Sequence, residues 1–264
     1  MERLLVLRLE SVGVAAEALI NGVPVARTGP GLRVATVAIH EYTLSGGNEL
    51  ELVIQPPPPG APSVPEPWVS DGHCGASLRL LLPRTGQLAH PENARTLALL
   101  EWAPVAEDVS EVPASVRRAV DLPIAFPRWR WLEAPVVDDP QSLRAPIAAY
   151  LQGLAVGLMR GDVEPLLLAA RLRLEDLAQA YQRSLADDVG RLRLQVQQLH
   201  ARSPLKPVMP KADTLCLRAV AGGRLLECLT PEGTPALQSP LADGGRVEWP
   251  VRVAVIEGRF YVLR

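Results

Sequence analysis

Short apolar runs separated by turn-forming residues characterise the first half of the chain and predict β-strands. Residues 48–55 are the clearest example, because Leu50, Leu52 and Ile54 alternate with glutamates and would share one face of a strand. The same pattern predicts strands at residues 4–10, 17–21, 23–27, 32–40, 76–82, 96–102 and 124–132. Together these segments predict an all-β sandwich.

Turn residues indicate how the first strands connect. Asn21 and Gly22 lie between two apolar segments and predict a two-residue β-hairpin, because both residue types tolerate a positive φ. Pro24 follows that turn and has no backbone donor, which predicts an edge strand. Residues 45–48 predict a second tight turn. The proline-rich residues 56–67 can form neither a helix nor a strand ladder, so we expect an extended loop there.

The apolar pattern changes to the period of a helix in the second half of the chain. One predicted helical stripe consists of Ile147, Tyr150, Leu151, Leu154, Ala155 and Leu158. Gly161 is expected to end this helix, and Asp162 is expected to cap the next one. A single helix over residues 163–200 would be roughly 57 Å long at about 1.5 Å per residue. We therefore expect breaks near residues 185–188 or at Gly190.

Antiparallel hairpins are predicted at the end of the chain, with turns at residues 222–223 and 257–258. If residues 222–223 form the first of these loops, the side chains of Cys216 and Cys228 point to opposite faces of the sheet, and no disulfide joins them. Helices followed by an antiparallel sheet predict an α+β domain in which the helices pack on the sheet.

The predicted architecture therefore has two domains. Residues 1–132 form an all-β sandwich, residues 133–144 form a linker, and residues 145–264 form the α+β domain. A chain of 264 residues is long enough for two domains that each bury a core.

Charge is distributed unevenly along the chain. The whole sequence has 27 basic and 29 acidic residues, so no overall positive field favours nucleic acid. Residues 1–140 hold 11 basic and 17 acidic side chains, whereas residues 141–264 hold 16 basic and 12 acidic ones. An acidic first half could attract a basic partner.

Targeting signals and cysteine pairs are not evident in the sequence. The first apolar run is too short for the core of a signal peptide, and no uninterrupted run approaches a membrane span. The 3 cysteines lack a CxxC spacing, which predicts neither a zinc site nor a disulfide framework. We expect a cytoplasmic protein that binds no membrane, no nucleic acid, no metal and no cofactor.

Catalytic motifs are incomplete. His40 and Glu41 begin an HExxH pattern, but Leu44 stands where the second histidine is needed to bind zinc. Cys74 follows His73 in a glycine-rich segment and is either a reactive thiol or a loop cysteine without a role. No acid–base pair can be nominated from spacing, so we expect a protein that is not an enzyme.

One candidate partner-binding segment is PRWRW, residues 127–131. As a strand it would place Trp129 and Trp131 on one face, where they could bind a protein, a glycan or single-stranded nucleic acid, or could cap the core of the sandwich.

The other candidate is AEDVSEV, residues 106–112. It presents Glu107, Asp108 and Glu111 in a loop between predicted strands. Acidic side chains in such a loop suit a basic partner, although an ordinary solvated loop is the simpler interpretation.

Two segments resemble known folds. ALINGVPV, followed by IHEYTLSGGNELELVI, resembles galactose-binding-like jelly-roll modules, in which an Asn-Gly hairpin precedes a strand entered through a Gly-Asn turn. AAYLQGLAVGLMRGDVEPLLLAA, together with the final WPVRVAVIEGRFYVLR, resembles the nuclear-transport-factor-two-like cone fold, a cystatin-like arrangement of helices on a sheet.

This combination of modules resembles the cytoplasmic immunity proteins that bacteria encode beside the toxins of type VI secretion systems. The resemblance implies a non-catalytic protein, a monomer or homodimer, that binds and occludes a cognate toxin, and a nuclease is the toxin we expect. An alternative is a carbohydrate-binding module joined to a small-molecule-binding or enzymatic cone-fold domain. The sequence supplies only Tyr42 as an aromatic side chain in residues 1–60, which gives the hairpin segment little of a sugar platform.

Overall fold

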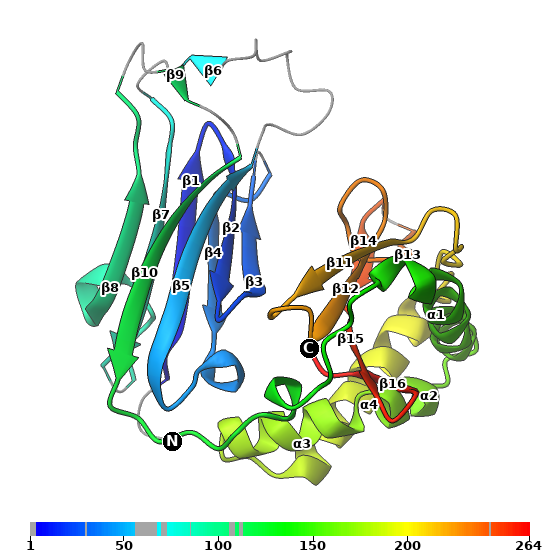
Figure 1. The fold of residues 1–264 in the computed structure, drawn as a ribbon. Helices are drawn as coiled ribbons and strands as arrows, with labels where there is room; N and C mark the ends of the chain where they lie inside the picture. The colour runs from blue at the N-terminus through cyan, green and yellow to red at the C-terminus, as the bar shows by residue number, and fades with distance from the viewer. Residues whose placement is uncertain are drawn as a thin grey trace. The chain divides into compact units, whose positions relative to one another are not determined.

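The computed structural model describes residues 4–29, 31–55, 68–69, 73–84, 86–105, 109–110, 113–242 and 244–264. Its contacts divide the chain into two compact units, Met1–Pro127 and Arg128–Arg264. The first unit is rich in β-structure, and the second combines helices with an antiparallel sheet (Figure 1).

The first unit contains two four-stranded antiparallel sheets in a sandwich-like arrangement. One sheet has the strand order β4-β1-β7-β8, with bounds Val34–Ala38, Val6–Val12, Gly75–Pro83 and Ala94–Trp102. The other has the order β10-β5-β2-β3, with bounds Ala114–Leu122, Gly46–Gln55, Ala15–Ile20 and Val23–Thr28. Two further short strands, β6 (Trp68–Val69) and β9 (Val109–Ser110), pair with each other. The 3₁₀ helices η1 and η2 span His40–Tyr42 and Pro91–Asn93.

The predicted Asn-Gly hairpin is confirmed between β2 and β3. Asn21 has a φ of 52° and Gly22 a φ of 74°, which is the left-handed backbone that the turn requires. The side chain of Asn21 also links neighbouring segments: its Nδ2 donates to the carbonyl of Tyr42 at 2.8 Å, and its Oδ1 accepts from the backbone N–H of Glu49 at 3.0 Å. Pro24 lies on β3, an edge strand, as expected. Asn21 is therefore both a turn former and a tie between strands.

Alternation in β5 is confirmed, because Leu50, Leu52 and Ile54 are fully buried while Glu49 is exposed. The strand predicted at residues 124–132 is wrong. The only regular structure there is a 3₁₀ helix, η3 (Arg130–Leu132), and Pro127 lacks the donor that a ladder would use.

The sequence prediction misses strand β10: Val116, Val120 and Leu122 do alternate with exposed residues, but the exposed Arg118 interrupts the inward-facing side. It is an edge strand that pairs with β5 along its whole length. Pairing with β5 therefore holds the strand where its own alternation is interrupted.

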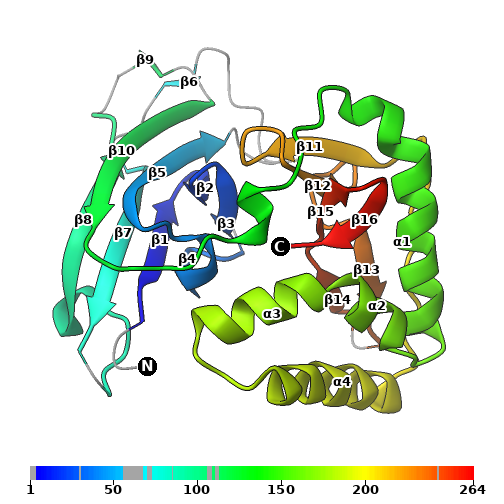
Figure 2. The ribbon, with the colours of Figure 1, turned by 60° about the horizontal axis from the view of Figure 1, so that its bottom comes forward.

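The second unit begins with η3 and η4 (Pro140–Leu143) and continues through four helices. These are α1 (Arg144–Met159), α2 (Glu164–Ala169), α3 (Arg171–Ala180) and α4 (Leu185–Arg202). A four-stranded sheet of order β11-β12-β15-β16 follows, with bounds Cys216–Val220, Leu225–Leu229, Arg252–Ile256 and Arg259–Val262. Strands β13 (Leu237–Pro240) and β14 (Arg246–Trp249) pair separately. Figure 2 shows α2 and α3 beside β16.

Helices and sheet share one apolar core in the second unit. The stripe predicted for α1 is buried in it, except that Tyr150 is only partly buried. The other core residues come from α2, α3, α4 and the sheet and include Leu166, Leu174, Val196, Leu217, Leu226, Val253 and Val262. Burial of these side chains from both layers is the main favourable contribution to folding of this unit.

The predicted break positions in the long helical segment are partly correct. Gly161 follows α1 with a φ of 70°, as expected. Asp162 accepts a hydrogen bond from the backbone N–H of Glu164 at 3.0 Å, although Val163 occupies the N-cap position. Helix α4 begins at Leu185, near the expected break, but it runs through Gly190 without interruption.

A further break separates α2 from α3 at Ala170. No glycine or proline marks this position, so the break has no local signal in the sequence.

The closing hairpins are confirmed. Strands β15 and β16 are joined at Glu257 and Gly258, both with positive φ. In the other hairpin, Cys216 pairs with Leu229 and Leu217 with Cys228, which is the expected register. Both cysteines are free thiols.

The segment expected to be a linker packs on the second unit. The guanidinium of Arg224 donates to the carbonyl of Ala134 at 2.6 Å, and the backbone N–H of Val137 donates to the carbonyl of Gly223 at 2.9 Å. The division between the units falls after Pro127, five residues before the sandwich end expected from the sequence.

None of the helices in the described part of the chain is both long and apolar enough to span a bilayer.

Candidate functional site

The tryptophans nominated for partner binding are buried. Trp129 is 0 % exposed and Trp131 is 2 % exposed. Their arginine neighbours are engaged within the second unit: Arg128 pairs with Glu133 at 3.1 Å, and Arg130 pairs with Glu175 at 2.6 Å. The conformation thus presents neither indole on the surface as a stacking platform.

The other nominated residues, Glu107, Asp108 and Glu111, lie outside the described residues.

The histidines considered for chemistry have structural contacts. His40 is buried, and its Nε2 accepts from the backbone N–H of Leu5 at 2.8 Å. Near the end of α4, His200 lies over Gly161 and its Nδ1 accepts from the backbone N–H of Leu205 at 3.3 Å. Across the described residues, no group of three or more His, Cys, Asp or Glu side chains could hold a metal ion.

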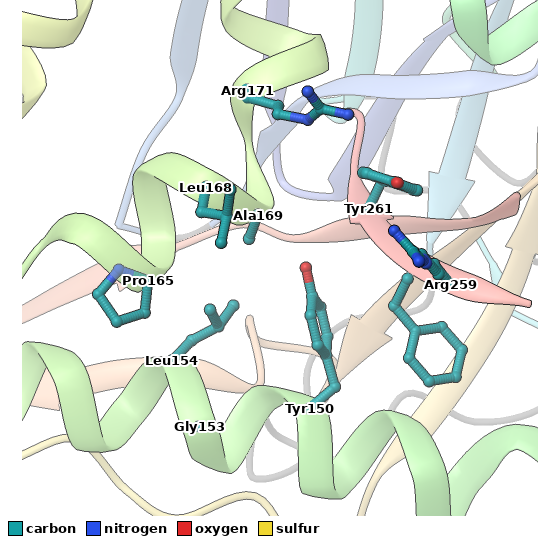
Figure 3. A pocket seen from close by; sticks show the side chains of 10 residues that line it. Tyr150, Gly153, Leu154, Pro165, Leu168, Ala169, Arg171, Arg259 and Tyr261 are labelled. Atoms are coloured by element: carbon teal, nitrogen blue, oxygen red, sulfur yellow. The ribbon is translucent and has the colours of Figure 1, made fainter.

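A cavity of about 520 Å³ lies in the second unit, between α1, α2, the start of α3 and β16 (Figure 3). Its lining residues are Tyr150, Gly153, Leu154, Pro165, Leu168, Ala169, Arg171, Arg259, Phe260 and Tyr261. The volume lies within the range of about 300–1,000 Å³ that is typical of small-molecule sites. This cavity is the candidate functional site.

Tyr150 provides the buried polar group of the cavity. Its hydroxyl has no hydrogen-bond partner within the described structure, and Figure 3 shows it directed into the space between α2 and β16. Burial, with smaller contributions from the nearby Cys228 and Tyr261, raises the pKa of Tyr150 from 10.0 to about 12. The phenol therefore remains neutral at physiological pH and can donate a hydrogen bond.

Two arginines give the cavity a positive charge. Arg171, at the start of α3, places its guanidinium 6.0 Å from the ring centroid of Tyr261, a cation–π contact that helps to hold both side chains. Arg259 begins β16 and is exposed. The lining contains no carboxylate, so the two arginines are its charged groups and the remaining walls are largely apolar.

The arrangement suits binding better than acid–base catalysis. Phenol and guanidinium groups donate hydrogen bonds and stabilise negative charge, but the lining holds no histidine or carboxylate to act as a general base at neutral pH. The sequence predicts Tyr150 in the core stripe, and in the alternative of a ligand-binding cone-fold domain Tyr150 or Tyr261 would be the centre of its polar groups; it does not single out Arg171 or Arg259. The one sequence feature that points to the cavity is the spacing of Arg259 and Tyr261, which places both side chains on the same face of a short strand.

A buried ion cluster lies in the same unit. The Asp176 carboxylate on α3 accepts hydrogen bonds from Arg264 at 3.3 Å and from Arg130 at 3.2 Å. Asp176 and Arg264 are almost fully buried, whereas Glu175, which also pairs with Arg130, is partly exposed. This cluster joins the start of the unit, α3 and the end of the described chain.

Comparison with known proteins returned no matching family model, no matching curated protein and no matching solved structure. What the fold itself defines is a mixed α/β chain with a β-rich first unit and a second unit of helices and antiparallel sheet.

Proposed function

We propose that this chain is a non-enzymatic immunity protein of the TsiT-like, type VI secretion class, which binds and neutralises a cognate antibacterial toxin in the cytoplasm. The observation that carries the proposal is the order of the modules. The segment ALINGVPV is a β-hairpin within a sandwich-like unit. In the second unit, residues 148–170 belong to the consecutive helices α1 and α2, and residues 249–264 contain the β15–β16 hairpin, which shares a core with them. A β-rich first unit and a second unit of helices and antiparallel sheet are compatible with the modules that the resemblance implies, and this order of modules supports the proposal.

Charge supports a basic partner for the first unit. A nuclease must bind phosphate with a basic cleft, and an inhibitor that carries acidic side chains can occupy that cleft. Neutralisation would occur by occlusion through an interface of about 1,600 Å² of total buried surface. Glu107, Asp108 and Glu111 are the acidic side chains proposed to contribute.

The decisive experiment is co-purification of the full chain with the product of the adjacent gene, combined with a growth assay in which that product is toxic. We expect a stable complex and rescue of growth by this chain. An adjacent product that is not toxic, or that does not bind, would refute the proposal.

The acidic segment is tested separately by a matched pair of variants. The triple change Glu107→Lys, Asp108→Lys and Glu111→Lys should weaken the complex and abolish rescue. A control with the same change in charge replaces three exposed acids of the same unit: Glu92→Lys, Glu101→Lys and Asp121→Lys. Equal loss in both triple variants would mean that overall charge, rather than this segment, determines binding.

The carbohydrate-binding alternative is tested on a glycan array. Its aromatic platform was assigned to Trp129 and Trp131, and burial of both indoles removes that support in this conformation. Sugar binding that is lost on Trp129→Ala without loss of folding would favour the alternative over the immunity proposal.

A further inference from the structure

The cavity of the second unit combines two kinds of surface. Leu154 and Leu168 contribute apolar wall, from α1 and α2 respectively. Figure 3 shows Arg171 and Arg259 near Tyr261, on the side of the cavity toward which the Tyr150 hydroxyl points. A ligand with an apolar body and one negatively charged end would match both surfaces at once.

The two guanidinium groups are available to such a ligand. In the described part of the chain neither Arg171 nor Arg259 forms an ion pair, and the contact of Arg171 with the Tyr261 ring, at 6.0 Å from the centroid, engages no carboxylate or carbonyl acceptor. The acid next to the cavity in sequence, Glu164, pairs instead with Arg193 at 2.8 Å. Both arginines therefore keep donors for a carboxylate.

Tyr150 adds a donor deeper in the cavity. A buried hydroxyl without a partner is costly, and an acceptor on a ligand would remove that cost. The phenol is neutral at physiological pH, so its proton is present for this hydrogen bond. Three residues with donor groups, from α1, α3 and β16, thus line one cavity.

We propose that this cavity binds a small organic carboxylate with an apolar body, the carboxylate paired with Arg171 and Arg259 and hydrogen-bonded by Tyr150. The apolar body packs against the walls formed by α1 and α2. This site is separate from the acidic segment assigned to the toxin and stands whether or not a toxin binds.

Binding is measured on the full chain with 8-anilinonaphthalene-1-sulfonate, a fluorescent aromatic anion, as the probe. Decanoate and 1-decanol are then compared as competitors, because they share a chain length and differ in charge. We expect saturable probe binding, and displacement by decanoate at a concentration at least tenfold lower than by 1-decanol. Equal potency of the two competitors would exclude recognition of the anion.

Variants localise the site. The double change Arg171→Gln and Arg259→Gln should weaken decanoate binding at least tenfold. Arg160→Gln with Arg202→Gln removes the same charge from exposed positions of the same unit outside the cavity, and should bind as the unaltered chain does. Tyr150→Phe should weaken binding several-fold while leaving the apolar wall intact.

A filling variant guards against indirect effects. A Cβ on Gly153 would meet no heavy atom within 4 Å, so a side chain can leave the backbone there without a clash. Gly153 lines the cavity, and Gly153→Leu should therefore fill part of it and weaken probe binding; an unchanged unfolding temperature checks that the fold is kept. Absence of any probe or decanoate binding to the unaltered chain overturns the proposal. Undiminished binding in both the double arginine variant and Gly153→Leu also overturns it.

Discussion

The ion cluster at Asp176 gives a sharp prediction about stability. Its carboxylate accepts from both terminal nitrogens of Arg264, each at 3.3 Å, and from Arg130 at 3.2 Å. Asp176→Asn keeps the shape of the side chain but removes the negative charge that compensates a buried guanidinium. Removal of one partner of a buried pair typically costs about 3–5 kcal/mol. Because the asparagine still offers one acceptor oxygen, we expect about 3 kcal/mol.

Glu175→Gln is the matched control. Glu175 is the neighbouring residue on α3 and pairs with the same Arg130 at 2.6 Å, but its side chain is 37 % exposed, against 5 % for Asp176. An exposed pair contributes about 0–1 kcal/mol. The two variants therefore differ mainly in burial, and the difference in free energy of unfolding between them should be at least about 2 kcal/mol.

Thermal and urea unfolding followed by circular dichroism measure this difference, with the transitions of the two units fitted separately. About 3 kcal/mol corresponds to a fall in Tm of roughly 6–12 °C, at about 2–4 °C per kcal/mol. Replacing the pair with apolar side chains, Asp176→Leu with Arg264→Met, should recover much of the loss. If Asp176→Asn proved no more destabilising than Glu175→Gln, the inferred cost of removing the charge of a buried ion-pair partner would be refuted.

Two further predictions concern glycines and thiols. Gly157→Ala in α1 should destabilise the protein, because the new Cβ would lie 2.9 Å from the carbonyl oxygen of Asp162. Gly190→Ala in α4 meets no atom within 4 Å and should stabilise the protein by about 0.5–1 kcal/mol. Urea midpoints compare the two variants, and a stability change of the same sign in both would contradict the packing argument. Burial raises the pKa of the Cys228 thiol far above its ordinary value, whereas Cys216 is only partly buried. Cys216 should therefore react much faster than Cys228 with Ellman's reagent in the folded protein. Mass spectrometry of the labelled peptides measures the two labelling rates, and equal rates would contradict the prediction.

The sequence predicted the hairpins correctly because the residues in their turns have strong backbone preferences of their own. Asn21 and Gly22 predicted a hairpin correctly because positive φ is accessible to those residue types, and the register of Cys216 against Leu229 followed from the glycine turn. The same logic failed at residues 124–132, where alternating arginine and tryptophan suggested a strand that has no pairing partner in the described structure. Periodicity predicts which face a residue would occupy, and a partner decides whether the strand forms.

The sequence by itself determined the elements whose preferences are local: the turns, the amphipathic stripe of α1, the end of that helix at Gly161, and the change from a β-rich half to a helical one. Tertiary structure alone decided which side chains meet. It brought Tyr150, Arg171 and Arg259 to one cavity from α1, α3 and β16, and it buried Trp129 and Trp131. Burial and cavities depend on packing between distant segments, and single-sequence periodicity carries no record of that packing.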